Sequence, residues 1–185
     1  MRIEQFMGHP VLVWEKGDFT DPEAIETIVV STGGFFAVWL DFKKAKEIHA
    51  KDYTAETIAT MSTLESGNYI NAIASVYDRL SACDKQCILA HEAAHIVHGD
   101  TVSDEMKASA NAAGVIDNIN VEIAADAYAA KLFGAKAVAA ALRNVGGAID
   151  SMPFMRKAMD NGFPGLAKLF EGDQVLGTRL AALEA

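Results

Sequence analysis

The sequence predicts an α+β fold, a mainly helical single domain with a small β-sheet near its N-terminal half. The chain has 185 residues, of which 51% are hydrophobic, so one domain can bury a sizeable core. Short β-branched and aromatic runs occur before residue 78, and alanine-rich segments with helical spacing dominate after it. We expect strands and a helix within residues 1–70, a central core at 71–145 and further helices at 146–185.

Strands are expected where short apolar runs are bounded by turn residues, at 10–14 and 35–40. Between these two runs, residues 21–23 are Asp-Pro-Glu, which combines the cap, the first-turn proline and the acid of a helix start. Residues 24–31 end in a β-branched run, so both helix and strand stay open there. The glycine pair at 33–34 ends this segment in either case.

Helices are expected where apolar residues recur with helical spacing, at 54–64, 84–99, 117–133, 135–145, 151–160, 164–171 and 174–184. Gly134 is expected to end one of these helices and the glycine pair at 146–147 the next, since glycine is unfavourable inside a helix. Residues 43–51 are polar and basic, and we expect them on the surface.

A metal-binding pattern lies in the helix expected at 84–99, where the sequence is His-Glu-Ala-Ala-His. His91 and His95 are four residues apart, so both imidazoles lie on one helix face and can reach one ion. A catalytic zinc takes three protein ligands and leaves a fourth position for water. Glu92 points about 100° further around the helix, where it can serve as general base toward that water. The pattern therefore indicates a zinc-dependent hydrolase.

The third ligand must come from another part of the chain. His98 lies on nearly the same face, but about 10 Å along the helix from His91, too far to share one ion. Glu122, in the next alanine-rich helix, is the better candidate. Asp126 lies one turn further on and faces the same way. Because metal-bound histidines usually donate their other N–H to a carboxylate, we expect Asp126 to accept a hydrogen bond from His91 or His95.

Three longer segments extend this pattern: Asn71–Ala74, Cys87–Asp100 and Glu122–Gly134. They resemble the N-A-F-A, V-L-A-H-E-x-x-H-x-x-x-G-D and E-x-x-A-D-x-x-A elements of the M48 zinc metallopeptidases of the gluzincin clan, which include CAAX prenyl proteases and heat-shock membrane proteases. Thr178–Leu183 resembles the family's R-I-x-x-L segment. The resemblance covers residues 71–145 well and 173–183 weakly, and residues 1–70 show none.

The resemblance implies a zincin-like active-site helix and a zinc-dependent endopeptidase, with one zinc ion held by His91, His95 and Glu122 and with Glu92 as base. It also implies an edge strand at 71–77 that lines the substrate cleft. The family's His-Pro pair before R-I-x-x-L is missing here, so the residue that stabilises the oxyanion stays open. Its candidates are Tyr128, Asn118, Asn120, His98 and Arg179.

The composition limits the partners. The net charge of −9 disfavours a nucleic acid, so we expect a peptide or protein substrate. The chain has no apolar run of 18 residues for a membrane span and no signal-peptide pattern at its N-terminus. Cys83 and Cys87 are expected to be reduced thiols, and we predict a cytoplasmic location. Cleavage specificity and oligomeric state stay open.

A second interpretation is a zinc-binding regulatory or partner-binding module with a latent or inactive protease site. Glu92 argues against it, because a structural zinc needs no general base and closes its fourth position with another ligand.

Overall fold

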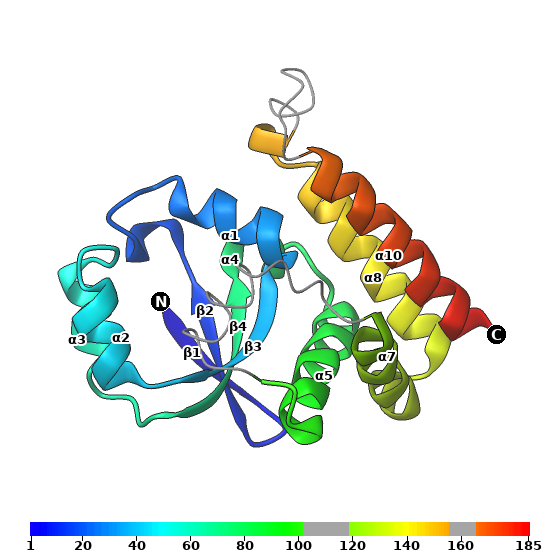
Figure 1. Ribbon diagram of the computed structural model, residues 1–185, viewed down its shortest axis with the longest axis horizontal. Coiled ribbons are helices and arrows are strands. Elements are labelled where there is room, and N and C mark those ends of the chain that lie inside the picture. Colours follow the sequence, from blue (N-terminus) through cyan, green and yellow to red (C-terminus); the bar gives the residue numbers. More distant parts are fainter. Residues whose placement is uncertain (102–118, 156–165) are drawn as a thin grey trace.

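In the part of the chain that the structure describes, strands occur only in the first 73 residues, and helices form most of the rest. The computed structural model describes residues 1–101, 119–155 and 166–185 (Figure 1). Within these ranges, four strands form one sheet with helices packed around it and beside it. The α+β fold predicted from the sequence is therefore confirmed, with the sheet in the N-terminal half.

The sheet has the strand order β1-β2-β4-β3, formed by Arg2–Phe6, His9–Trp14, Gly67–Ile73 and Phe35–Leu40. β1 and β3 run antiparallel to their neighbours, whereas β2 runs parallel to β4, with Val11 opposite Ile70. β4 thus lies inside the sheet, and every side chain from Tyr69 to Ile73 is buried.

The prediction of an edge strand at residues 71–77 is wrong. β4 ends at Ile73, residues Ala74–Tyr77 form the short helix α4, and β3 is the outer strand on that side. β4 pairs with β2 on one side and with β3 on the other, and its side chains from Tyr69 to Ile73 are buried, so it takes an interior position.

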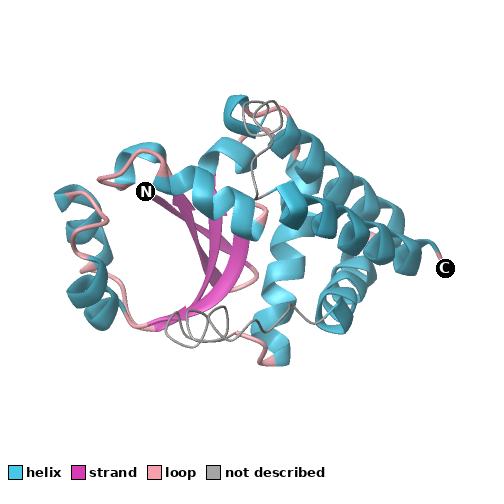
Figure 2. Cartoon of the chain, turned by 45° about the horizontal axis from the view of Figure 1, so that its top comes forward, coloured by secondary structure: helices cyan, strands magenta, loops and turns pink. Residues whose placement is uncertain are grey.

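Helices cover the sheet from more than one side. Figure 1 shows α2 (Phe42–His49) and α3 (Ala55–Met61) on one side and α5 (Ala82–His98) on the other. Figure 2 shows α1 (Ala24–Thr32) lying across the upper part of the sheet. The short 3₁₀ helix η1 (Lys16–Asp18) follows β2. α5 contacts both β3 and β4, so it joins the sheet to the helical half.

The helical half consists of α5 together with α7 (Ile119–Phe133), α8 (Ala135–Asp150) and α10 (Leu166–Glu184). α5 packs against α7 and α8, and α10 packs against α7 and α8 from the outer side (Figure 1). Among the described residues, we find no helix with the length and hydropathy that a membrane span requires.

Residues 24–31, which the sequence left open between helix and strand, are helical. Ile25 and Val29 are one turn apart in α1 and both are buried in the core. This packing outweighs the weak helix propensity of the β-branched run. Gly33 ends α1 with a φ of 67°, and a side chain at Gly34 would place its Cβ 2.9 Å from the Val76 side chain.

The glycine pair at 146–147 does not end its helix, contrary to the expectation from the sequence. α8 continues through both glycines to Asp150. Apolar side chains on either side of the pair pack against the core, namely Val145, Ala148 and Ile149. Their burial outweighs the cost of about 1 kcal/mol for each glycine in a helix.

Other segments differ from expectation in extent. α10 is one continuous helix where the sequence predicts two, at 164–171 and 174–184. The surface segment at 43–51 forms most of α2, whose first backbone N–H groups are capped by Asp41. The expected limits of the central core, 71 and 145, fall inside β4 and α8. The helix expected at 151–160 lies largely outside the described residues.

Candidate metal centre

The helix α5 carries both histidines of the predicted metal centre. At its start, the Ser81 hydroxyl accepts a hydrogen bond from the Asp84 N–H, and at its end Gly99 adopts a left-handed conformation. The helix is regular between these caps. His91 and His95 therefore lie on the same face, with their rings edge to face and the centroids 4.9 Å apart.

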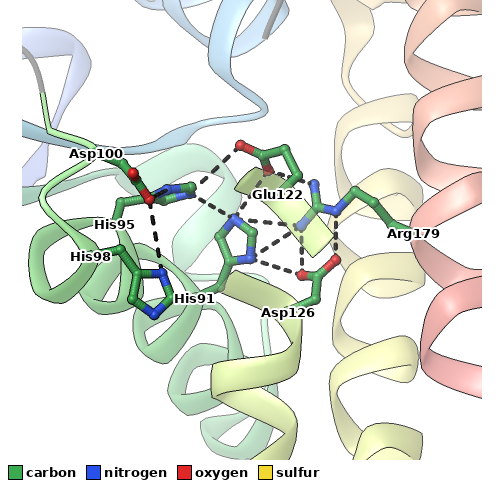
Figure 3. Close-up of polar contacts among 7 residues, drawn as sticks. All are labelled: His91, His95, His98, Asp100, Glu122, Asp126 and Arg179. Carbon is green, nitrogen blue, oxygen red and sulfur yellow. Dashed lines mark hydrogen bonds and ion pairs between the residues drawn. The ribbon is translucent and has the colours of Figure 1, made fainter. Parts of the chain in front are cut away.

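The helix α7 packs along α5 and brings Glu122 to this face (Figure 3). The Nε2 atoms of His91 and His95 are 3.2 Å apart. Glu122 places Oε2 3.2 Å from His91 Nε2 and Oε1 3.6 Å from His95 Nε2. In a tetrahedral site with bonds of about 2.0–2.1 Å, ligand atoms are about 3.3–3.4 Å apart. These three side chains are therefore in range to hold one metal ion.

Asp126 and Arg179 lie behind His91. Asp126 is 1% exposed, and its Oδ1 is 2.8 Å from His91 Nδ1. Arg179, on α10, donates from Nε and Nη2 to the two oxygens of Asp126, at 2.7 and 2.8 Å. Its Nη1 lies 3.2 Å from Glu122 Oε2. Because Nδ1 of His91 is taken up by Asp126, Nε2 is the nitrogen left for a metal.

The pKa values follow from these contacts. Burial by itself lowers the pKa of His91, but hydrogen bonds to Asp126 and Glu122 outweigh burial and raise it to about 9. Burial raises the pKa of Glu122, but the hydrogen bond to His91 and the nearby positive charges lower it to about 2. Burial is likewise outweighed at Asp126, whose pKa is lowered by hydrogen bonds from Arg179 and His91. Without metal, the two carboxylates and the imidazole thus form charged pairs.

Two further carboxylates lie around this cluster. Glu92 is buried, and its charge raises the pKa of both His91 and Arg179. On the outer side, Asp100 places Oδ2 3.7 Å from His95 Nδ1. The same oxygen lies 3.8 Å from Nδ1 of His98, so the last histidine of α5 faces Asp100 rather than the three ligand atoms (Figure 3).

The formal charges of the cluster suit a divalent cation. With neutral imidazoles, the carboxylates of Glu92, Glu122 and Asp126 against the guanidinium of Arg179 leave two negative charges. Uncompensated charge in a buried site is costly. Two imidazole nitrogens and a carboxylate oxygen are also a donor set that zinc accepts. The residues present therefore fit such an ion both in charge and in ligand type.

The structure brings together the residues that the sequence assigned to this site: His91, Glu92, His95, Glu122 and Asp126. Of the candidates for an oxyanion-stabilising residue, Arg179 contacts carboxylates, Tyr128 packs edge-on against His98 with centroids 5.9 Å apart, and Asn118 lies outside the described residues.

Two contacts of the site were missed by sequence reasoning. The segment Thr178–Leu183 pointed to Arg179, but no spacing rule predicts its pairing with Asp126, 53 residues away. Asp100 follows α5 directly, yet its position beside His95 depends on how the chain turns after Gly99.

Comparison with known proteins adds no family to this description, because no family model, curated protein or solved structure matches the chain. The function is therefore inferred from the motif residues and from their geometry.

Proposed function

We propose that this protein is a zinc-dependent endopeptidase. The observation that carries the proposal is the close approach of possible ligand atoms from His91, His95 and Glu122. The two Nε2 atoms are 3.2 Å apart, Glu122 Oε2 lies 3.2 Å from His91 Nε2, and Glu122 Oε1 lies 3.6 Å from His95 Nε2. These separations are close to the roughly 3.3–3.4 Å between ligand atoms of a tetrahedral zinc site. Zinc bound by such ligands acidifies water and polarises a carbonyl group.

The chain itself supplies the groups that bind, orient and move a proton. His91 and His95 offer their Nε2 atoms, and Asp126 holds the His91 ring by accepting from Nδ1. Glu92 is the adjacent buried carboxylate. In our proposal it accepts a proton from the attacking water at a carboxylate oxygen and donates it to the leaving amine.

The base is tested by Glu92→Gln, with Glu56→Gln, an exposed glutamate of α3, as matched control. We expect Glu92→Gln to keep its zinc and to lose hydrolysis of unfolded casein by a factor of about 10²–10⁴ or more. The control should cleave casein like the wild type, and a chelator should stop cleavage by the control and by the wild type. Cleavage by Glu92→Gln at the wild-type rate would remove Glu92 from the mechanism.

The third ligand is tested by Glu122→Ala and elemental analysis of the purified protein. Loss of one of three ligands should lower zinc affinity by orders of magnitude. Unchanged metal content would exclude Glu122 as a ligand. Wild-type protein that holds zinc tightly but cleaves no peptide in a library would favour the alternative, a partner-binding module with a latent site.

The proposal includes a peptide or protein substrate and a cytoplasmic location. Both cysteines are free thiols in the structure, and burial, followed by the neighbouring Cys83 thiol, raises the pKa of Cys87 to about 11. A thiol of this kind is unreactive at neutral pH. Two cysteines that remain free are what we expect of a protein in a reducing compartment. Cell fractionation tests the location.

A further inference from the structure

Arg179 reaches the metal centre from α10, the last helix of the chain. All three nitrogens of its guanidinium face carboxylates of α7, with Nε and Nη2 on Asp126 and Nη1 toward Glu122 (Figure 3). We propose that Arg179 is a positioning residue that holds Glu122 and Asp126 in the arrangement that binds the metal. α10 then belongs to the site. This inference rests on the proposed zinc function.

The first route runs through Asp126 to His91. The planar guanidinium binds both oxygens of Asp126 at 2.7 and 2.8 Å, a paired geometry that fixes the carboxylate in rotation as well as in position. Asp126 Oδ1 then meets His91 Nδ1 at 2.8 Å. Arg179 therefore sets the plane of the group that orients one ligand histidine.

The second route runs directly to Glu122. Glu122 and Asp126 are one turn apart on α7, where like charges repel each other. Arg179 lies between them, with Nη1 3.2 Å from Glu122 Oε2. The same oxygen is 3.2 Å from His91 Nε2. The guanidinium thus offsets the repulsion and keeps the Glu122 carboxylate beside the histidines.

These contacts distinguish a positioning role for Arg179 from two other roles, which are binding of a substrate carbonyl and simple anchoring of α10. Its side chain is 15% exposed and each of its three nitrogens already contacts a carboxylate, so the contacts in the structure assign it to Asp126 and Glu122 rather than to a substrate carbonyl. A mere anchor for α10 would resemble the pair of Arg143 on α8 and Glu184 on α10, which is more than half exposed. Exposed pairs of that kind contribute little, which makes Arg143 a matched control.

The test compares Arg179→Gln, Arg179→Lys and Arg143→Gln in the full chain. Zinc affinity is measured by competition with a chromophoric chelator, and the visible spectrum of bound Co²⁺ reports ligand geometry. We expect Arg179→Gln to bind zinc about 10–100-fold more weakly, with an altered Co²⁺ spectrum. Arg179→Lys keeps the charge but has one nitrogen, so it should stay at least about tenfold weaker than wild type. Arg143→Gln should bind like the wild type.

Wild-type zinc affinity and an unchanged Co²⁺ spectrum in the Arg179 variants would overturn the inference. So would an equal loss in Arg143→Gln, because both arginines would then only anchor α10. If Arg179→Gln shows no cooperative unfolding transition and is therefore not folded, the zinc affinity and the Co²⁺ spectrum of Arg179→Lys decide the test. Failure of the proposed function is distinguishable, because the wild type itself would then bind no zinc or, with zinc bound, cleave no peptide.

Discussion

Along its central strand the sheet buries one neutral amide, whereas the metal centre gathers buried and partly buried charged groups. Asn71 of β4 accepts a hydrogen bond from Trp14 Nε1 at 2.8 Å and donates one to the Phe36 carbonyl at 3.4 Å. Apolar side chains surround this pair. At the metal centre, by contrast, carboxylates, imidazoles and a guanidinium lie within hydrogen-bonding distance of one another (Figure 3).

The difference indicates which region is suited to a ligand. A neutral amide is satisfied by one or two hydrogen bonds, and the apolar layer around it is stable by burial alone. Buried carboxylates also require charge balance, which the guanidinium of Arg179 and a protonated His91 supply only in part for Glu92, Glu122 and Asp126. We therefore expect the sheet to determine the stability of the fold, and the metal centre to respond to metal and to pH.

The largest effect is expected from His95→Ala, which should lower zinc affinity by roughly 10³-fold or more. His95 is partly buried and lies at the rim of the cluster, so the free energy of unfolding in chelator should change little. Chelator competition and urea unfolding measure the two quantities. His98→Ala is the matched control, since His98 faces Asp100, and a comparable loss of zinc there would mean that the ligand set is misassigned.

Ile70→Ala in β4 is expected to lower stability without changing zinc affinity, the opposite of His95→Ala. Ile70 is 0% exposed, and removing its side chain should lower the free energy of unfolding by about 2–5 kcal/mol. Zinc affinity of the folded protein should not change. Ile3→Ala, at an exposed position of β1, should be nearly neutral in both assays. Weaker zinc binding in Ile70→Ala would show that the two regions are coupled.

In the metal-free protein, the site should make stability depend on pH. His91 has a folded pKa of about 9, above its ordinary 6.5, so its contribution is complete below pH 6.5 and is lost as the pH rises through 9. Glu122 has a folded pKa of about 2, below its ordinary 4.5, so its contribution is complete above pH 4.5 and is lost as the pH falls through 2. The site should therefore stabilise the fold most between about pH 4.5 and pH 6.5. Toward the acid end and toward the alkaline end, the free energy of unfolding should fall by roughly 1–3 kcal/mol.

Urea unfolding in chelator across this pH range measures the effect. In His91→Ala the fall on the alkaline side should disappear, because the group that titrates there is gone. A fall of the same size in that variant would assign the pH dependence to other groups. Saturating zinc should reverse the alkaline fall in the wild type, since a metal binds the deprotonated imidazole.

The smallest effect is expected from Gly146→Ala. A Cβ at this position in α8 meets nothing within 4 Å, so alanine should raise the free energy of unfolding by about 0.5–1 kcal/mol. Gly33→Ala is the contrasting variant, because its φ of 67° strains any other residue, and it should be destabilised. A destabilised Gly146→Ala would show that the glycine pair is needed in the helix after all.

The candidate site was more predictable than the sheet that supports it. The ligands on α5 follow from spacing along one helix, and the positions of Glu122 and Asp126 follow from spacing along another. The sheet was harder because similar apolar runs exclude no pairing. The edge position expected for the strand at 71–77 came from the family resemblance, and the strand at Arg2–Phe6, with its alternating half-exposed side chains, was not identified.

The sequence by itself determined the local chemistry of this protein: which side chains can bind a metal, which helix face carries each of them, and which carboxylate lies next to the ligands. These properties depend on residues within one or two helical turns. Only the tertiary structure decided that β4 lies inside the sheet, that α8 passes through two glycines, and that Arg179 contacts Asp126 and Glu122. Those outcomes depend on packing between segments far apart in the chain, where the burial of distant partners outweighs local preference.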